Sequence, residues 1–477
     1  MSWTESVLVG SFCAPIKKFL IDESCTFLYQ GEIPSSGPSP SYIIQSPCKQ
    51  FLYCTVETVD AATSQVMSFR CSDEEEFSFQ LLSTQPAGGG APCFLSVDEK
   101  NNYLFVSNYF GGNVTVFPID CETGILSPVV QDLSFNTPLG PHLFLNRDSG
   151  HCHQTVHLTH SQNILLCELG QNAVYTFAFS PQPGCVTPHT VLTQTNCWVA
   201  PPASGPRHLV VHPSEKVVYV LSELACTVMA LRMDPLTGRI LSPSALSEHS
   251  ADTNADTDTD TDAGAGSGSG EAVQCYSTLR ESERDLPPET MNAAEILLSP
   301  DARFLYISNR DVCLDVRLGV SVSVCDNGTS SQPPSLSRCS IAVFAVLHEG
   351  TQLQPLQQVS SLGCHPRAMT LLHGGSHLAV ANKDGGYCTQ SSLTATAMGG
   401  SCDSDNDSSS LKRSQGGNLV VFPIAPDATG LLLVEEALVT DVLFPASLQS
   451  SDIMSEERQG PVLAEPTWLH PFTFNSR

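Results

Sequence analysis

The sequence is 477 residues long, with 49 acidic and 22 basic side chains, a formal net charge of −27 and an apolar share of 41%. We do not expect so acidic a chain to bind nucleic acid or an anionic membrane surface, because both require a basic face. The apolar share is enough for a core, and a repeat fold of this size can form one body.

The first residues, Met1 to Glu5, include no basic segment followed by a long apolar run, so no signal peptide is predicted. No stretch approaches the roughly 20 apolar residues that a membrane span needs. The 19 cysteines are scattered, and no C-x-x-C pair recurs. We therefore expect reduced thiols, a cytoplasmic location, no zinc ribbon and no membrane association.

One pattern recurs along the chain: a turn corner, a strand rich in β-branched and aromatic residues, a polar turn, and a second strand that ends on a polar residue. Its clearest copy is Gly205–Pro213 followed by Val217–Glu223. Strand-like runs at residues 6–11 and 16–30 form an opening fragment. The recognisable copies then follow at residues 40–69, 91–124, 153–177, 205–238, 293–344 and 365–430.

Each copy has about three strands and a hairpin turn that leads to a fourth. Turns such as Asp120–Gly124 end on glycine, which takes the positive φ that the turn requires. A period of roughly 50–60 residues with four strands is typical of a propeller and not of a solenoid. One open sheet of roughly 28 strands is excluded, because open twisted sheets rarely exceed about 10. The prediction is an all-β fold, with residues 1–477 as a single seven-bladed β-propeller of four-stranded blades.

Low-complexity segments interrupt this period. Residues 250–271 are Asp-Thr repeats followed by Gly, Ala and Ser, and residues 389–417 are rich in Ser, Asp and Gly. Both are predicted to be disordered inserts, because such compositions bury no core. A weaker insert is expected over residues 317–338.

Polar residues stand at one position of the aligned copies, the end of the second strand, namely at Asn108, Glu168, Glu223, Asn309 and Asn382. A propeller brings equivalent positions of its blades into a ring around the axis, so these side chains are candidates for a shared site. They could instead be turn formers that cap strand ends. Glu223 is the hardest to explain as a cap, because a carboxylate near a crowded axis needs a partner.

Arg207 and Arg310 would supply that partner. Arginine offers a planar fork that binds carboxylate or phosphate oxygens in pairs, so two arginines at one channel mouth would make a local anion site. The alternative is a structural Arg–Glu pair that fixes neighbouring blades. Arg367, in Cys364–Arg367, stands in its copy where Arg207 stands in its own, and is a further candidate.

These motifs resemble the lactonase seven-bladed propeller family, which includes bacterial-type 6-phosphogluconolactonases and the carboxy-cis,cis-muconate cyclases. The resemblance rests on the segments His151–Gln154, Gly205–His208, Ser222–Leu224, Ser308–Arg310 and Ala381–Lys383. It implies that His153, Arg207, Glu223 and Arg310 are the catalytic residues of the central cleft. The segment Glu168–Asn172 departs from the family's D-L-G-x-D pattern, since it lacks the second acid.

The resemblance implies hydrolysis of a sugar lactone, with 6-phosphogluconolactone of the pentose phosphate route as the expected substrate. His153 or Glu223 would be the general base, and an arginine would steady the oxyanion. The expected substrate-binding residues are His151, His208, Asn108, Asn309, Arg367 and Asn382.

The expected partner is a small anionic sugar lactone, bound by a monomer that needs no cofactor and no metal. A metal site made by His151, His153 and His208 is an open alternative. Two other functions also stay open. The chain could be a lactonizing cyclase or a lactonase for another sugar acid, or it could be a non-catalytic propeller that binds protein partners.

Overall fold

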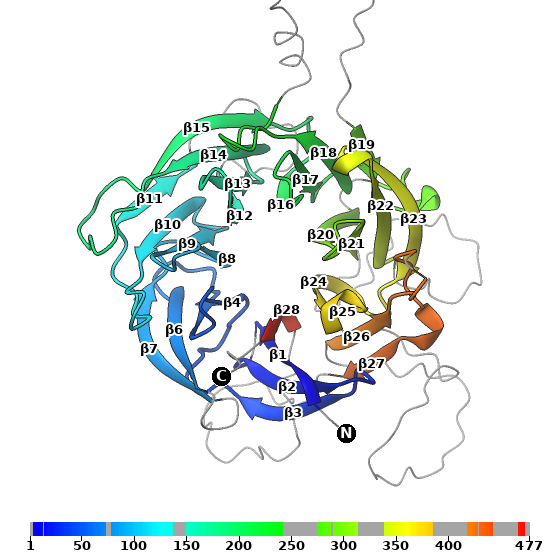
Figure 1. Ribbon diagram of the computed structural model, residues 1–477, viewed down its shortest axis with the longest axis horizontal. Coiled ribbons are helices and arrows are strands. Elements are labelled where there is room, and N and C mark those ends of the chain that lie inside the picture. The colour runs from blue at the N-terminus through cyan, green and yellow to red at the C-terminus, as the bar shows by residue number, and fades with distance from the viewer. Residues whose placement is uncertain are drawn as a thin grey trace, which may run out of the picture.

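Seven four-stranded antiparallel sheets stand in a ring around a central axis (Figure 1). The computed structural model describes residues 3–12, 14–72, 78–136, 149–241, 274–287, 290–312, 338–384, 417–427, 429–441 and 466–472. In this part of the chain almost every regular element is a strand, so the predicted seven-bladed propeller is confirmed. The inserts predicted at 250–271 and 389–417 lie outside the described residues except for Gly417, as does the one at 317–338 except for Arg338.

Each blade runs from an innermost strand at the axis to an outermost strand at the rim. In that order the first three blades are β28 (Pro466–Phe472), β1 (Trp3–Ser11), β2 (Lys17–Asp22), β3 (Phe27–Glu32); β4 (Ile43–Gln45), β5 (Phe51–Val56), β6 (Gln65–Ser72), β7 (Ser78–Pro86); and β8 (Pro92–Val97), β9 (Tyr103–Asn108), β10 (Asn113–Pro118), β11 (Gln131–Ser134).

The next two blades are β12 (Cys152–His157), β13 (Ile164–Glu168), β14 (Ala173–Phe179), β15 (Leu192–Val199); and β16 (Pro206–Val211), β17 (Val217–Ser222), β18 (Thr227–Arg232), β19 (Gln274–Ser277). The last two are β20 (Met291–Leu298), β21 (Phe304–Asp311), β22 (Ser340–Leu347), β23 (Gln352–Ser360); and β24 (Cys364–Leu372), β25 (His377–Asp384), β26 (Asn418–Pro423), β27 (Leu438–Asp441). Short 3-10 turns are η2 (Glu281–Glu283), η5 (His348–Gly350), η6 (His373–Gly375) and η7 (Val434–Glu436).

The ring closes where β28, from the far end of the sequence, pairs antiparallel with β1, matching Leu8 with His470 and Val9 with Leu469. The sequence reading had three strands in this opening fragment and missed the fourth. In Figure 1 the red strand β28 lies at the axis beside the blue β1.

The hydrophobic core lies between the blades. The described residues form seven apolar clusters, and each draws on two neighbouring blades: one, for example, joins Phe105 of β9 to Leu166 of β13. Every residue of β5, β9 and β17 is buried, because blades cover both faces of these second strands. These strands therefore read as nearly continuous apolar runs in the sequence.

Turns between the two outer strands of a blade pack against the preceding blade. Gly124, with φ of 77°, lies against the ring of Phe51, and Gly430, with φ of 72°, lies against Phe304. Tyr219 Oη donates to the Gly350 carbonyl at 2.9 Å, and Tyr306 Oη to that of Gly430 at 3.2 Å. These glycines therefore allow the turn conformation and also allow the close contact between neighbouring blades.

We expect Gly124→Ala to destabilise the propeller by about 2–5 kcal/mol, because its new methyl group meets the buried Phe51 ring while the backbone keeps a positive φ. Gly184→Ala is the matched control: φ there is 81°, but nothing lies within 4 Å of the added carbon. The control should lose only about 1–2 kcal/mol. Urea unfolding of both variants measures the difference, and equal losses would show that the contact between blades contributes nothing.

Candidate active site

Irregular pairing in the innermost strands selects which side chains face the axis. In β8, β12, β16 and β24 one residue is skipped between paired neighbours, and in β20 two are skipped. Such β-bulges leave the extra residue outside the ladder and re-aim its side chain. The skipped residues, all near the start of an innermost strand, are Cys93, His153, Arg207, the pair Ala294 and Glu295, and Arg367. The five consecutive blades that begin with β8, β12, β16, β20 and β24 thus contribute side chains at one level around the axis.

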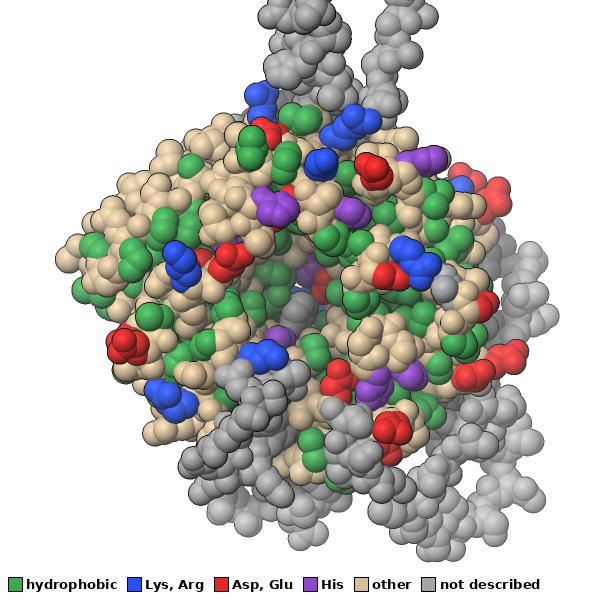
Figure 2. Space-filling view, viewed as in Figure 1, with side chains coloured by type: hydrophobic (Ala, Val, Ile, Leu, Met, Phe, Trp, Pro, Cys, Tyr) green, Lys and Arg blue, Asp and Glu red, His purple; other side chains and the backbone are tan. Residues whose placement is uncertain are grey.

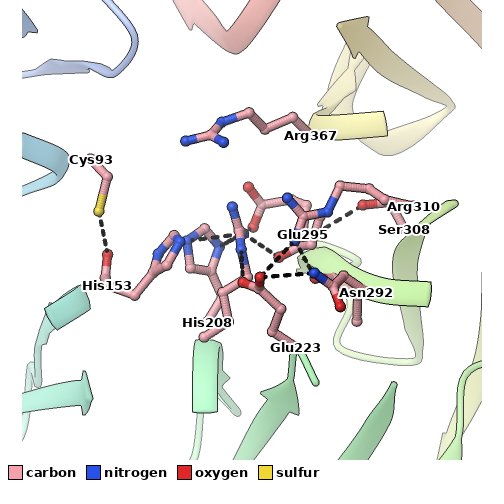
Figure 3. A network of polar contacts seen from close by, with 12 residues as sticks. Cys93, His153, His208, Glu223, Asn292, Glu295, Ser308, Arg310 and Arg367 are labelled. Atoms are coloured by element: carbon pink, nitrogen blue, oxygen red, sulfur yellow. Dashed lines mark hydrogen bonds and ion pairs between the residues drawn. The ribbon is translucent and has the colours of Figure 1, made fainter. Parts of the chain in front are cut away.

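Glu223 lies between two arginines. Its Oε2 is 3.1 Å from Arg207 Nε and its Oε1 is 3.2 Å from Arg310 Nη2, while Asn292 Nδ2 donates to Oε1 at 3.3 Å. Both guanidinium groups also donate to backbone carbonyl groups of β20, because Arg207 Nη1 donates to the Ala294 carbonyl and Arg310 Nη2 donates to the Ala293 carbonyl. Burial lowers the pKa of Arg207 to about 10, with Arg310 acting in the same direction and Glu223 opposing. Figure 3 shows Glu223 at the centre of this network.

His208 and Glu295 form a second buried pair. His208 Nδ1 lies 2.8 Å from Glu295 Oε1, and both side chains are less than 5% exposed. Arg207 Nη1 is 3.4 Å from both ring nitrogens of His208, an equal spacing that places it over the imidazole. Ser308 Oγ accepts the Glu295 backbone N–H at 3.0 Å. Burial lowers the pKa of His208, and Glu295 opposes that shift.

His153 completes the group. Its ring packs edge-on against His208, with centroids 4.8 Å apart, and against Tyr109 at 5.6 Å. Its Nδ1 is buried and has no hydrogen-bond partner among the described residues. Burial, followed by the charge of Arg207, lowers the pKa of His153 well below its ordinary value. The imidazole is therefore neutral near pH 7 and has a nitrogen lone pair available.

The structure thus brings together the four residues that the resemblance implies, His153, Arg207, Glu223 and Arg310, and places His208 beside them. Arg207 Nε and Arg310 Nε are buried without an aligned hydrogen bond to any described residue, so the contact of Arg207 Nε with Glu223 is an ion pair only. Buried polar groups with unused capacity call for an explanation, and a bound ligand is one. Their roles in catalysis remain predictions.

Other predicted residues lie outside this network. His151 Nδ1 is 3.0 Å from the Tyr109 carbonyl, and the two rings are tilted against each other with centroids 4.6 Å apart. The three asparagines Asn108, Asn309 and Asn382 are fully buried. Their side-chain amides donate to Thr115, Thr278 and Ser361 respectively. This geometry favours the alternative that these asparagines have a structural role at strand ends.

The alignment of Glu223 with these asparagines was wrong by one residue. Pro92 pairs with Asn108 and Pro366 with Asn382, but Pro206 pairs with Ser222. Glu223 therefore corresponds to the residue after Asn108 and, in the neighbouring blade, to Arg310. Because side chains alternate along a strand, this step of one residue places Glu223 and Arg310 on the side opposite to the asparagines.

Glu168 does take the ring position of the asparagines. It is fully buried, and its carboxylate accepts the backbone N–H groups of His151 and Gln171. Burial raises its pKa to about 7, against the opposing effect of these hydrogen bonds. Its contacts are structural ones, since they fix the segment that leads to His153.

Sequence reasoning missed Glu295, Asn292 and Cys93. Cys93 Sγ lies 3.5 Å from the His153 carbonyl oxygen, and burial raises the pKa of its thiol, which keeps the thiol protonated. Glu295 had a usable signal: it interrupts an apolar run, Ala293–Leu298, at the place where other copies carry His153 or Arg207. No three described His, Cys, Asp or Glu side chains come together as metal ligands, so the metal alternative gains no support there.

A cavity of about 630 Å³ opens at the same end of the channel. Its lining residues lie before or at the start of innermost strands, or at or after the end of second strands, which is the end where the bulges and Glu223 lie. They are Phe12, Ser39, Glu57, Thr58, Val59, Ala91, Phe110, Val312, His365 and Lys383. Figure 2 shows the molecule hollowed near its axis, with histidine and acidic side chains in the hollow.

Among the described elements, none is a helix of the length and apolarity that a membrane crossing demands.

The fold and the site together define a class of protein: propellers that hold buried arginines, carboxylates and histidines around the axis. The chain belongs to the lactonase family of seven-bladed β-propellers, whose family model, described as "Lactonase, 7-bladed beta-propeller", matches residues 7–396.

Similar proteins support this placement. A 6-phosphogluconolactonase of Bacillus subtilis (strain 168) is 24% identical over 371 residues, which are 78% of this chain and 85% of that protein. A 6-phosphogluconolactonase of Formosa agariphila is 24% identical over 344 residues, 72% of this chain and 78% of its own length. The crystal structure of a Bacteroides fragilis protein, provisionally named a 6-phosphogluconolactonase, matches with a TM-score of 0.65 and 20% identity, covering 98% of this chain and 97% of that one.

Proposed function

We propose that this protein hydrolyses a sugar lactone at the axial site, with 6-phosphogluconolactone as substrate and 6-phosphogluconate as product. The observation that carries the proposal is the meeting of a neutral, buried His153 with the Arg207–Glu223–Arg310 network, built from three different blades. Neutral imidazole can take a proton from water, and guanidinium groups can hold the charge that develops on a carbonyl oxygen. The names of the distant relatives agree with this chemistry.

In the proposed reaction, water attacks the ring carbonyl carbon while His153 Nδ1 accepts its proton. Arg207 and Arg310 hold the oxyanion, and the bond to the ring oxygen then breaks as His153 returns the proton to that oxygen. The product is a hydroxy acid, whose new carboxylic acid group releases its proton to solvent and becomes a carboxylate near neutral pH. Glu223 is the weaker candidate for the base, because its two ion pairs stabilise the ionised carboxylate and occupy its oxygens. It positions the arginines instead, while the His208–Glu295 pair supports the His153 ring.

The pH profile follows from the environment of His153. Because its pKa lies well below 6.5, the base form persists into acid solution, and the acid limb of kcat/KM should lie below pH 6.5. Rates between pH 4 and 8, corrected for spontaneous hydrolysis, measure that limb. A limb at or above pH 6.5 would show that another group governs the reaction, or that the pKa of His153 is not lowered.

A panel of lactones with and without a phosphate tests the proposal. A kcat/KM for the phosphorylated δ-lactone well above that for unphosphorylated lactones supports it. A higher kcat/KM for another sugar lactone, or formation of a lactone from a muconate, would favour the second class of function. Failure to turn over any lactone would leave the propeller as a binding scaffold.

The site of this reaction in the cell would be the cytoplasm. No disulfide joins cysteines within the described residues, which fits a reducing compartment. Fractionation of the producing cells, with the chain followed by an antibody, tests this location.

A further inference from the structure

Arg367 differs from the other two arginines of the site. It occupies the bulge of β24 as Arg207 occupies that of β16, and Figure 3 shows its guanidinium group reaching toward His153 and Glu295 without joining their network. Its ion-pair partner among the described residues is Glu57, whose Oε1 is 3.8 Å from Nη2. The Arg367 guanidinium also lies over the Phe12 ring, 4.9 Å from its centre.

By contrast, Arg207 and Arg310 each bind Glu223 and a backbone carbonyl at closer range. An ion pair at 3.8 Å is too long for a hydrogen bond, so the fork of Arg367 keeps donors for another anion. Arg367 is nevertheless close enough for its charge to contribute to the low pKa of His153. The group is therefore poised beside the proposed reaction centre without being part of it.

Glu57 presents a matching acceptor. Its Oε2 is buried and has no hydrogen-bond partner among the described residues, and the carboxylate lines the cavity of about 630 Å³. Burial raises the pKa of Glu57, against the opposing effects of the Arg367 charge and of the Ser41 side chain. His365 and Lys383 line the same cavity, and Phe12 forms part of its wall. A carboxylate oxygen with unused capacity in such a place suits the hydroxyl groups of a sugar acid.

We propose that Arg367 and Glu57 form a distal subsite, in which Arg367 binds the anionic substituent of the lactone and Glu57 accepts a sugar hydroxyl group. This subsite, which rests on the proposed function, selects lactones that carry a phosphate or carboxylate remote from the ring carbonyl. A neutral lactone has no anion for Arg367 and leaves the Arg367–Glu57 pair as it is. The reaction centre at His153, Arg207 and Arg310 then treats both kinds of lactone alike.

Steady-state kinetics of Arg367→Gln on 6-phosphoglucono-δ-lactone and glucono-δ-lactone test this inference. Each charge-assisted hydrogen bond lost should lower kcat/KM for the phosphorylated lactone about 10- to 100-fold, mostly through KM. The rate on glucono-δ-lactone should stay within about threefold of wild type, because the reaction centre is untouched. Arg303→Gln is the matched control, since it removes a half-exposed arginine that pairs with Asp301 away from the cavity.

The outcomes separate the subsite from the proposed function. Equal losses on both lactones, or no loss on the phosphorylated one, would overturn the subsite while leaving the hydrolase intact. Wild-type protein that hydrolyses neither lactone would overturn the proposed function itself. Inhibition by 6-phosphogluconate and gluconate gives a second readout: Arg367→Gln should weaken only the phosphorylated inhibitor, and equal weakening of both would contradict the subsite.

Discussion

Replacing His153 with glutamine should lower kcat for the lactone about 10²- to 10⁴-fold, the usual contribution of one positioned general base. KM should change little, because His153 acts on water and not on the substituents of the substrate. Glutamine keeps a polar side chain of similar length but cannot accept a proton near neutral pH. Initial rates measured near pH 6.5, with the spontaneous rate subtracted, give the comparison.

His157→Gln is the control for that experiment, because His157 stands on the same strand, β12, away from the network. It should retain the wild-type rate. If His153→Gln hydrolyses the lactone at the wild-type rate, His153 has no role in proton transfer, and Glu223 becomes the candidate base again.

The second large effect is expected from Glu223→Gln, which removes the carboxylate between two guanidinium groups. Arg207 is 2% exposed and Arg310 is 13% exposed at the side chain, so neither charge is well solvated once Glu223 is gone. Breaking a buried ion pair by removing one partner costs about 3–5 kcal/mol of folding free energy. Loss of the arginine alignment should also lower kcat/KM about 10²- to 10³-fold.

A double variant separates these two losses. Glu223→Gln with Arg310→Gln removes one of the stranded charges, so it should recover part of the stability without recovering activity. Urea unfolding and initial rates on the same preparations make the comparison. A Glu223→Gln protein that is as stable and as active as wild type would show that the Arg–Glu–Arg contact is incidental.

The repeat pattern made the architecture predictable. Apolar second strands and glycine-ended turns such as Asp120–Gly124 indicate blades, because both follow from local chain preferences and from burial between sheets. The closing strand β28 escaped detection because Pro466–Phe472 contains two prolines and pairs with residues at the other end of the sequence. No local sequence feature of that segment indicates that it pairs with β1.

The site was predictable only in part. The arginines and His153 stand out as polar residues in apolar strands, and the structure brings them together. The level at which they meet depends on bulges, which are irregularities of pairing between strands and have no fixed sequence signal. For that reason Glu223 was placed one residue out of register, and Glu295 was missed.

The most direct measurement is a crystal structure of the protein with 6-phosphogluconate. We expect the product carboxylate to lie between Arg207 and Arg310, within hydrogen-bond distance of His153 Nδ1, and the phosphate to lie on Arg367. A product bound on the outer rim, or at the opposite end of the channel, would contradict this expectation.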